Sequence, residues 1–362
     1  MFCIFSTVDQ RLFSAHKIGG IEVILDENVN KKSTSFPSLT ELLDYARTNG
    51  SYAIHDSLLK AGNVISRFSK PCCSISGGKD SDIMLDLISR VDKRNRVKYV
   101  WFDTGIEYQA TKDHLDYLEQ KYGVKICREK AIKPIPISCK EYGQPFLSKR
   151  VSDMIERLQR HNFQWEDDTY ENLIAKYPKC KTAIGWWTNH FESIQFNIDY
   201  NKYLKEFIIQ NPPQFKISSK CCTYAKKKVG NRFNEKEGCD LTIIGVRKAE
   251  GGVRSSAYKN CFTNNDEKLK ASQYRPLFWY VDADEELYDK LFNIQHSDCY
   301  AKYGLKRTGC VGCPYGRNLE EELAIIEKYE PKLLKAVTNV FRDSYEYTRQ
   351  FREYVKQRKQ KQ

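Results

Sequence analysis

A short polar turn near the first quarter of the chain carries residue types that bind phosphate. It consists of Ser76, Gly77, Gly78, Lys79, Asp80 and Ser81. The apolar run 72–75 before it and the helical spacing of apolar residues over 83–88 after it predict a buried strand, a turn and a helix. The glycines allow a tight turn, Lys79 is positive, and a helix start offers unpaired amides. The turn therefore predicts an anion site, most simply for a nucleotide phosphate. The alternative is a plain strand–turn–helix connection.

Cysteine is the second residue type that points to chemistry. The chain has 13 cysteines, which in a reducing compartment favour metal or sulfur chemistry over disulfides. The adjacent Cys221 and Cys222 and the later pair Cys310 and Cys313 form a set of four. Four thiolates suit an iron–sulfur cluster or zinc equally well. Cys261 or Cys299 could replace one member, and we interpret the remaining cysteines as structural: Cys3, Cys72, Cys73, Cys127, Cys139, Cys180 and Cys239.

The elements that must position these groups alternate between strand and helix. Strands are expected at 71–75, 97–102, 124–128 and 241–246, with helices to about Arg90 and over 111–122. This alternation predicts an α/β fold with a doubly wound, mainly parallel sheet, whose ligands bind at the carboxyl ends of the strands. Asp103, Thr104 and Gly105 follow the second strand, so we expect them at the same sheet edge as the phosphate turn.

The sequence S-G-G-K-D-S resembles the PP-loop of the ATP pyrophosphatases. That group includes adenylating tRNA-thiolation enzymes and the sulfonucleotide (APS/PAPS) reductases. The resemblance implies an adenine nucleotide α-hydrolase-like fold, with ATP and Mg²⁺ bound at residues 76–81 and cleavage between the α and β phosphates. Asp103, Thr104 and Gly105 resemble the D-T-G turn of the reductases, which implies a place near the ribose or adenine.

Two further segments extend the resemblance. The stretch containing Arg247 and Arg254 resembles the one that closes over the sulfonucleotide in the reductases, which implies that both arginines bind phosphate and join Lys79 and Asp80 in catalysis. The CC…CxxC pattern resembles the iron–sulfur APS reductases, which implies that Cys221, Cys222, Cys310 and Cys313 hold a [4Fe–4S] cluster. This resemblance favours iron–sulfur over zinc.

One departure from the reductases shapes the functional hypothesis. They carry a catalytic cysteine in a short C-terminal motif, whereas no cysteine follows Cys313 here. We therefore expect a PP-loop sulfurtransferase that adenylates an acceptor and releases pyrophosphate, with sulfur from a cysteine desulfurase or another donor. The acceptor is expected to be nucleic acid, either DNA in phosphorothioation or tRNA. The alternatives are a sulfonucleotide reductase with a relocated nucleophile and a non-catalytic nucleotide-binding iron–sulfur subunit of a modification complex.

The domain organisation follows from where the alternation begins and stops. We expect an N-terminal cap over 1–70, a PP-loop domain over 71–316 with a helical insertion at 143–213, and a basic helical extension over 317–362. The net charge of +12 suits an anionic partner. The start of the chain lacks a secretory pattern and no stretch has the ~20 apolar residues of a membrane span, so we expect a cytoplasmic protein with no membrane contact.

The insertion mixes aromatic and basic residues. Trp165, Trp186 and Trp187 alternate with lysines that include Lys179 and Lys181. Such a mixture can stack bases and follow a phosphate backbone, which makes the insertion a candidate substrate platform. The alternative is a helical insertion whose tryptophans are buried.

Overall fold

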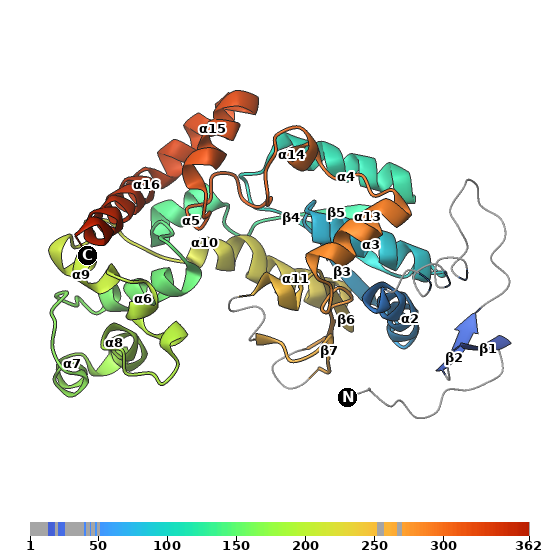
Figure 1. The fold of residues 1–362 in the computed structure, drawn as a ribbon, viewed down its shortest axis with the longest axis horizontal. Helices are drawn as coiled ribbons and strands as arrows, with labels where there is room; N and C mark the ends of the chain where they lie inside the picture. Colours follow the sequence, from blue (N-terminus) through green and yellow to red (C-terminus); the bar gives the residue numbers. More distant parts are fainter. Residues whose placement is uncertain are drawn as a thin grey trace. The chain divides into compact units, whose positions relative to one another are not determined.

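The chain forms two compact units whose segments interleave along the sequence. The computed structural model describes residues 14–18, 21–25, 40, 44, 48, 51–251, 257–265 and 270–361. The first unit comprises residues 1–73, 82–97 and 240–295, and the second comprises 74–81, 98–239 and 296–362. Figure 1 traces the elements along the chain.

The first unit packs helices on short strands. Strand β6 (Leu241–Ile244) pairs in parallel with β8 (Ser272–Tyr274), and β7 (Phe262–Thr263) pairs with β8 in the antiparallel sense. Helix α2 (Tyr52–Ser66) is joined to the segment before α13 (Asp282–Phe292) by a 2.6 Å hydrogen bond between Ser57 and Tyr280. Strands β1 (Ser14–Ile18) and β2 (Ile21–Leu25) form a separate antiparallel pair.

The second unit contains the parallel pair β4 (Lys98–Asp103) and β5 (Ile126–Lys130). Strand β3 (Pro71–Ile75) and helix α3 (Lys79–Val91) run through the boundaries of the two units. The strand order is β5-β4-β3-β6-β8-β7 in one six-stranded sheet. This mostly parallel sheet with its helices confirms the predicted α/β fold, and the antiparallel β7 lies at its edge.

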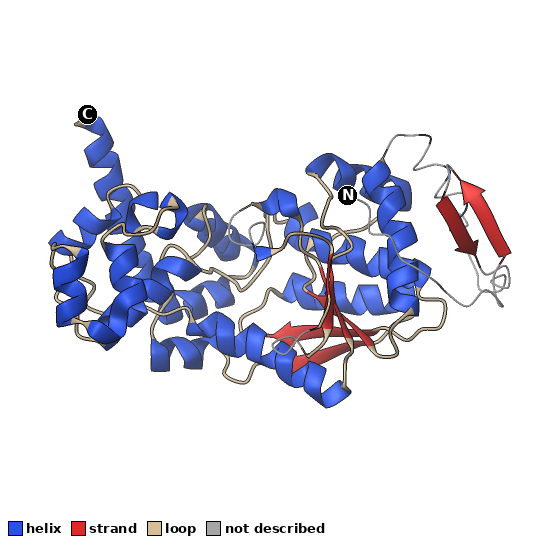
Figure 2. Ribbon diagram, turned by 90° about the horizontal axis from the view of Figure 1, so that it is seen from below, coloured by secondary structure: helices blue, strands red, loops and turns tan. Residues whose placement is uncertain are grey.

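The remaining helices of the second unit form two apolar cores. One core holds the insertion and the end of the last helix, where Tyr347 and Phe351 pack with Phe207. Figure 2 shows this part built from helices and loops. The other core surrounds the cysteine pairs. The helices are α4 (Gln109–Tyr122), α5 (Ile135–Tyr142), α6 (Lys149–Arg160), α7 (Tyr170–Lys176), α8 (Lys181–Trp187), α9 (Leu204–Gln210), α10 (Lys220–Cys222), α11 (Lys228–Glu237), α14 (Asp298–Ala301), α15 (Leu319–Tyr329) and α16 (Pro331–Gln360).

The structure confirms the alternative of buried tryptophans in the insertion and corrects one expectation about the cysteines. Trp186 and Trp187 are fully buried, 1% and 0% exposed, and Trp165 packs edge-on against Trp187 and Phe163. Trp186 and Trp187 lie in the core of the insertion and offer no surface to bases, and the partly buried Trp165 packs against that core. Burial of these large apolar rings stabilises the fold. Disulfides were not expected, yet Cys72 and Cys239 are disulfide-bonded. Within the described part of the chain, no helix is both long and apolar enough to cross a membrane.

Candidate active site

The phosphate turn is closed by its own hydroxyl groups. The Ser81 hydroxyl accepts hydrogen bonds from the amides of Ser76 and Gly77, both at 3.1 Å, and the Ser76 hydroxyl accepts one from the Gly78 amide at 3.3 Å. Gly77 has φ +70°, and a Cβ there would lie 2.8 Å from the Thr111 methyl group. A side chain at this position would therefore be strained and would also collide with α4. Ser81 is buried, so its hydroxyl shapes the loop.

The open side of the turn faces a segment that the motif did not predict. Helix α3 begins at Lys79, whose amide donates to the Tyr300 hydroxyl at 3.3 Å. Tyr300 in turn shares a 2.9 Å hydrogen bond with the Thr308 hydroxyl. The hydroxyls of Ser76, Tyr300 and Thr308 all lie within 3.3 Å of the position that a Gly78 Cβ would take. The first amides of a helix and several hydroxyls thus surround one point, an arrangement suited to phosphate oxygens.

Lys79 supplies the charge at this point. Its side chain is exposed, and its ammonium lies 5.3 Å from the centre of the Tyr300 ring. Among the described residues it forms no ion pair, so its charge is available to a ligand. Asp80 follows it in the first turn of α3.

The D-T-G turn lies at the end of β4 and is held by its own side chains. The Asp103 carboxylate accepts from the Gly105 amide at 2.9 Å, and the fully buried Thr104 hydroxyl donates to Glu107 at 2.5 Å. Burial raises the pKa of Glu107 to about 7, against the opposing effects of Lys226 and of the hydrogen bonds from Thr104. Glu107 is therefore a buried carboxyl group that can carry a proton near neutral pH.

The first cysteine pair occupies the start of a helix. Helix α10 contains Cys221 and Cys222, and a π-helical turn over Thr223–Lys227 leads from it into α11. Two adjacent side chains can reach one centre only from a turn or a helix terminus, as the sequence required. Single π-helical turns are frequent at functional sites.

The second cysteine pair is fixed by three separate elements. The amide of Val311, between the two cysteines, donates to the Ile106 carbonyl beside the D-T-G turn at 3.3 Å. The Gly312 amide donates to Glu322 of α15 at 3.2 Å, and the Gly312 carbonyl accepts from the Tyr345 hydroxyl of α16. The C-terminal helices therefore position this loop.

The four thiols lie in one electrostatic neighbourhood. A hydrogen bond with the Cys139 thiol and burial raise the pKa of Cys221, while its bond with Cys222 lowers it. A hydrogen bond with the Cys221 thiol, together with burial, raises the pKa of the Cys222 thiol. Burial raises the pKa of Cys313, and the nearby Cys310 and Cys222 raise it further. Burial also raises the pKa of Cys310, and the Lys226 ammonium lowers it.

These residues fit a metal–thiolate group by type and surroundings. Buried thiols that raise one another's pKa hold their protons until a cation neutralises them, and Lys226 offsets part of the negative charge. Across the described residues no three His, Cys, Asp or Glu side chains already form a metal-holding group. Four buried thiols of this kind suit an iron–sulfur cluster or zinc.

The two rival cysteines have contacts of their own. Cys299 is fully buried, with its sulfur 3.6 Å from the Thr111 hydroxyl. Cys261 belongs to the first unit, where its backbone carbonyl accepts a hydrogen bond from the Arg275 amide. The additional sulfur beside Cys221 is that of Cys139 in α5.

One of the two arginines predicted to bind phosphate, Arg247, lies in the first unit. The Arg247 side chain forms ion pairs with Asp282 and Glu285, both at 2.8 Å. Its guanidinium is 11% exposed, so a phosphate would have to compete with these two carboxylates. Arg254 lies outside the described residues.

Sequence reasoning missed several residues that the fold brings to the site. Tyr300, Thr308, Glu107 and Cys139 are separated in the chain and come together only through packing. Thr308 had a signal, because it stands two residues before Cys310 in a loop already singled out. The others carry no local pattern.

Comparison with known proteins supports the family resemblance over part of the chain. Residues 70–180 match the family model of the phosphoadenosine phosphosulfate reductase domain. This segment includes the phosphate turn and the D-T-G turn and ends before Cys221. An uncharacterized protein of Methanocaldococcus jannaschii is 26% identical over 147 residues, which make up 40% of this chain and 29% of that protein. The chain therefore matches less than a third of that relative's length.

Three solved structures are distant likenesses. The phosphoadenylyl-sulfate reductase of Candida auris, in a phosphate complex, is 14% identical, with 76% of this chain and 98% of that chain covered and a TM-score of 0.39. The U34-tRNA thiolase NcsA of Methanococcus maripaludis, with its [4Fe–4S] cluster, is 17% identical, with 77% and 70% covered and a TM-score of 0.33. The NH3-dependent NAD synthetase of Campylobacter jejuni is 12% identical, with 81% and 95% covered and a TM-score of 0.32.

Proposed function

We propose that this chain is a PP-loop enzyme that activates an acceptor with ATP and replaces the activated oxygen with sulfur. The observation that carries the proposal is the connection between the phosphate turn and the cysteine loop within one unit. Tyr300 and Thr308 contact the turn, and Thr308 leads after one residue into Cys310. This connection supports a single site for nucleotide binding and thiol chemistry.

The proposed reaction has two steps. An acceptor oxygen attacks the α-phosphorus of ATP, the bond to the β-phosphate oxygen breaks, and pyrophosphate leaves, with Mg²⁺ and Lys79 neutralising its charge. A sulfur nucleophile from a desulfurase or another donor then attacks the activated atom and displaces AMP. We propose nucleic acid, DNA or tRNA, as the acceptor, because the chain carries a net charge of +12.

The test is release of pyrophosphate from ATP with and without nucleic acid, on protein purified without oxygen and analysed for iron and sulfide. The proposal expects release that requires Mg²⁺ and rises severalfold with DNA or tRNA. Release that never responds to nucleic acid would exclude these acceptors, and no release would exclude the activation step.

Sulfonucleotide reduction is a second candidate, favoured by the family model that matches residues 70–180. It requires a cysteine nucleophile that attacks the sulfur of the sulfonucleotide. Sulfite formation from APS or PAPS with reduced thioredoxin would identify this activity. Nucleotide binding with neither activity would indicate a non-catalytic subunit.

A further inference from the structure

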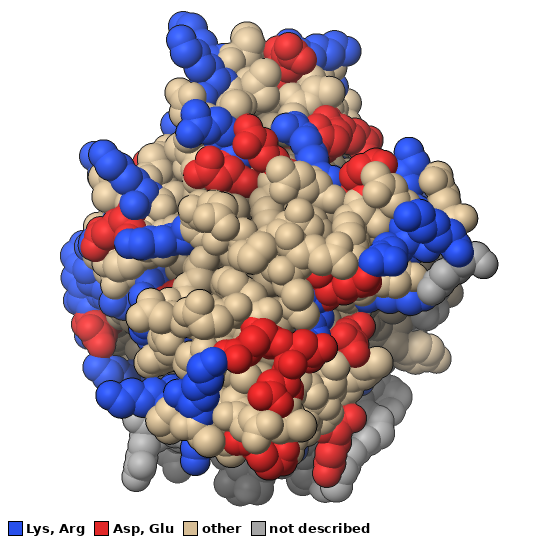
Figure 3. Space-filling model, turned by 90° about the vertical axis from the view of Figure 1, so that its left-hand side faces the viewer, with Lys and Arg blue, Asp and Glu red and all other residues tan. Residues whose placement is uncertain are grey.

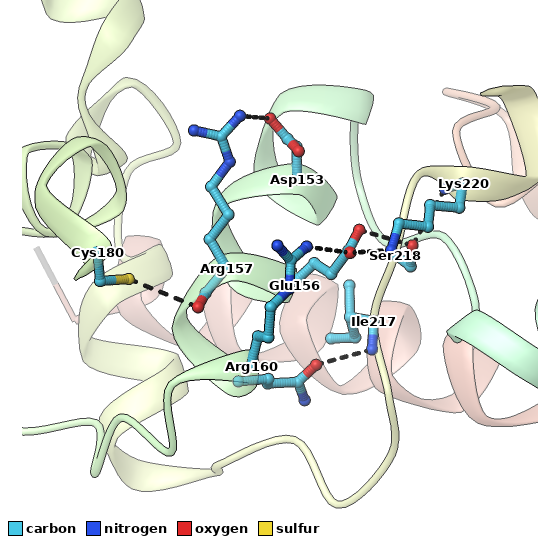
Figure 4. Close-up of polar contacts among 9 residues, drawn as sticks. Asp153, Glu156, Arg157, Arg160, Cys180, Ile217, Ser218 and Lys220 are labelled. Atoms are coloured by element: carbon cyan, nitrogen blue, oxygen red, sulfur yellow. Dashed lines mark hydrogen bonds and ion pairs between the residues drawn. The ribbon is translucent and has the colours of Figure 1, made fainter. Parts of the chain in front are cut away.

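A basic cavity opens beside the first cysteine pair. It has a volume of about 710 Å³ and lies between α6, the start of α8 and the segment that carries Cys221 and Cys222. Figure 4 shows the polar contacts along its wall. Its charged lining consists of Arg157, Arg160, Lys179, Lys181, Lys220 and Lys228 against Asp153 and Glu156.

The charges of this cavity do not balance. Its two carboxylates are already used: Asp153 pairs with Arg157 at 3.1 Å, and Glu156 pairs with Arg160 at 2.6 Å and Lys220 at 2.9 Å. Lys179, Lys181 and Lys228 form no ion pair within the described residues. Six cations against two carboxylates leave an excess of four positive charges, which favours a ligand with several negative charges.

A stacked tyrosine pair extends this positive surface beyond the cavity. The rings of Tyr142 and Tyr224 are 5.0 Å apart and nearly parallel, at 5°. Lysines lie close to these rings: Lys133 and Lys220 at 4.7 and 5.0 Å from the Tyr142 ring, and Lys228 at 4.3 Å from the Tyr224 ring. Stacked aromatic rings among ammonium groups are typical of surfaces that bind single-stranded nucleic acid.

The wall of the cavity includes chain neighbours of the first cysteine pair. Ser219, Lys220 and Thr223 line the cavity and flank Cys221 and Cys222 in the chain. Glu156 holds this segment on α6 by accepting from Ser218 at 2.8 Å as well as from Lys220 (Figure 4). A strand bound in the cavity therefore lies next to the residues that we assign to sulfur chemistry.

We call the basic cavity, together with the adjoining rings of Tyr142 and Tyr224, the groove. We propose that this groove binds a single-stranded segment of nucleic acid. Phosphates pair with Lys179, Lys181 and Lys228, and a base stacks on the pair formed by Tyr142 and Tyr224. The proposal rests on the proposed function only in naming this strand as the acceptor. A free nucleotide would also be attracted by the cavity, but it would not span both the lysines at the start of α8 and the Tyr142 ring, which lies outside the cavity lining.

The test is fluorescence anisotropy of a labelled 15-nucleotide single strand, made once as RNA and once as DNA, at several salt concentrations without ATP. The double variant Lys179→Glu/Lys181→Glu is compared with Lys332→Glu/Lys335→Glu. The two change the net charge equally, and all four lysines are exposed. Lys332 and Lys335 lie on α16 outside the cavity lining.

We expect the groove variant to bind at least ~10-fold more weakly and to lower the salt slope by about 1.4, since each phosphate contact with a single strand contributes about 0.7. The control should stay within ~2-fold of the original chain. Tyr224→Leu should weaken binding about 10-fold with the salt slope unchanged. The better of the two probes identifies the kind of strand.

Equal weakening in both double variants would overturn the proposal, because binding would then follow net charge alone. Failure of the original chain to bind either strand would overturn it as well. Because the measurement needs no turnover, the two proposals fail separately. Groove-dependent binding without pyrophosphate release would contradict only the proposed function, and release that persists in the groove variant with unchanged binding would contradict only the groove.

Discussion

The phosphate turn and the basic groove could both attract anions, but the groups that create their positive potential differ. In the turn it comes from the exposed ammonium of Lys79, beside backbone amides and hydroxyls that hydrogen bonds of 3.1 to 3.3 Å hold in place. In the groove it comes from long side chains on α6, α8 and the segment around Cys222. On the face shown in Figure 3, basic and acidic side chains are interspersed over the surface.

This difference indicates what each region can recognise. Amides in a rigid turn select one anion of defined shape and cost no side-chain entropy. Flexible lysines in an open groove suit a backbone whose phosphates repeat and whose exact position can vary. Substitutions in the turn should therefore abolish turnover of the nucleotide. Substitutions in the groove should instead weaken the binding of nucleic acid by degrees.

Removing the charge in the turn should have the largest effect. Lys79→Ala is expected to slow pyrophosphate release about 100- to 1000-fold, because it removes the positive charge of the phosphate turn. Iron content should stay normal. Lys335→Ala, an exposed lysine of α16, is the matched control for turnover. Unchanged turnover in Lys79→Ala would show that this loop does not bind the reacting phosphates.

The proposal that the four cysteines hold an iron–sulfur cluster can be tested by visible absorption. Cys310→Ser is expected to lose the absorption near ~400 nm and most of the bound iron, because one of four ligands is removed. Cys299→Ser should keep both, since its sulfur contacts Thr111. The measurement is the visible spectrum and iron per chain after anaerobic purification. The reverse pattern would move the ligand set to Cys299.

A substitution at a glycine tests how the backbone of the cysteine loop is held, without changing any of the cysteines. Gly312 has φ +59°, and a Cβ there would lie 2.6 Å from the Tyr345 hydroxyl. Gly312→Ala should lower the free energy of unfolding by about 2 kcal/mol or more through strain and collision. Gly309→Ala, where a Cβ meets nothing within 4 Å, should change it by less than about 0.5 kcal/mol. Equal effects in denaturant titrations would contradict this account.

The smallest predicted effect concerns the groove wall. Although burial acts to raise it, hydrogen bonds from Lys220, Ser218 and Arg160 leave the pKa of Glu156 lowered. The ionised form is thus stabilised in the folded chain. Glu156→Gln should cost about 1–2 kcal/mol of unfolding free energy at pH 7. This difference should be present above the ordinary carboxyl pKa and should disappear as the pH falls below about 4.

The control for this prediction is Asp153→Asn. Its ion pair with Arg157 joins two side chains that are about 40% exposed, so we expect a change below about 0.5 kcal/mol. Denaturant titrations of both variants at pH 7 and at low pH give the comparison. A Glu156→Gln cost that is independent of pH would contradict the role of its charge.

Local sequence determined the elements and the turn. The apolar run before Ser76 and the helical pattern after Asp80 predicted β3 and α3, and the glycines predicted the turn, because these features depend on backbone conformation and on neighbours a few residues away. The helix predicted over 111–122, observed as α4 (Gln109–Tyr122), could be predicted for the same reason.

Packing between distant segments decided the rest. No spacing in the sequence placed Tyr300 on the Lys79 amide, Cys139 beside Cys221, or Glu156 against Ser218. The buried tryptophans of the insertion and the pairing of Arg247 with two carboxylates were likewise fixed by the fold. A residue's type limits the chemistry that it can perform. Its partners depend on which surfaces the whole chain buries together, and that is a property of the tertiary structure alone.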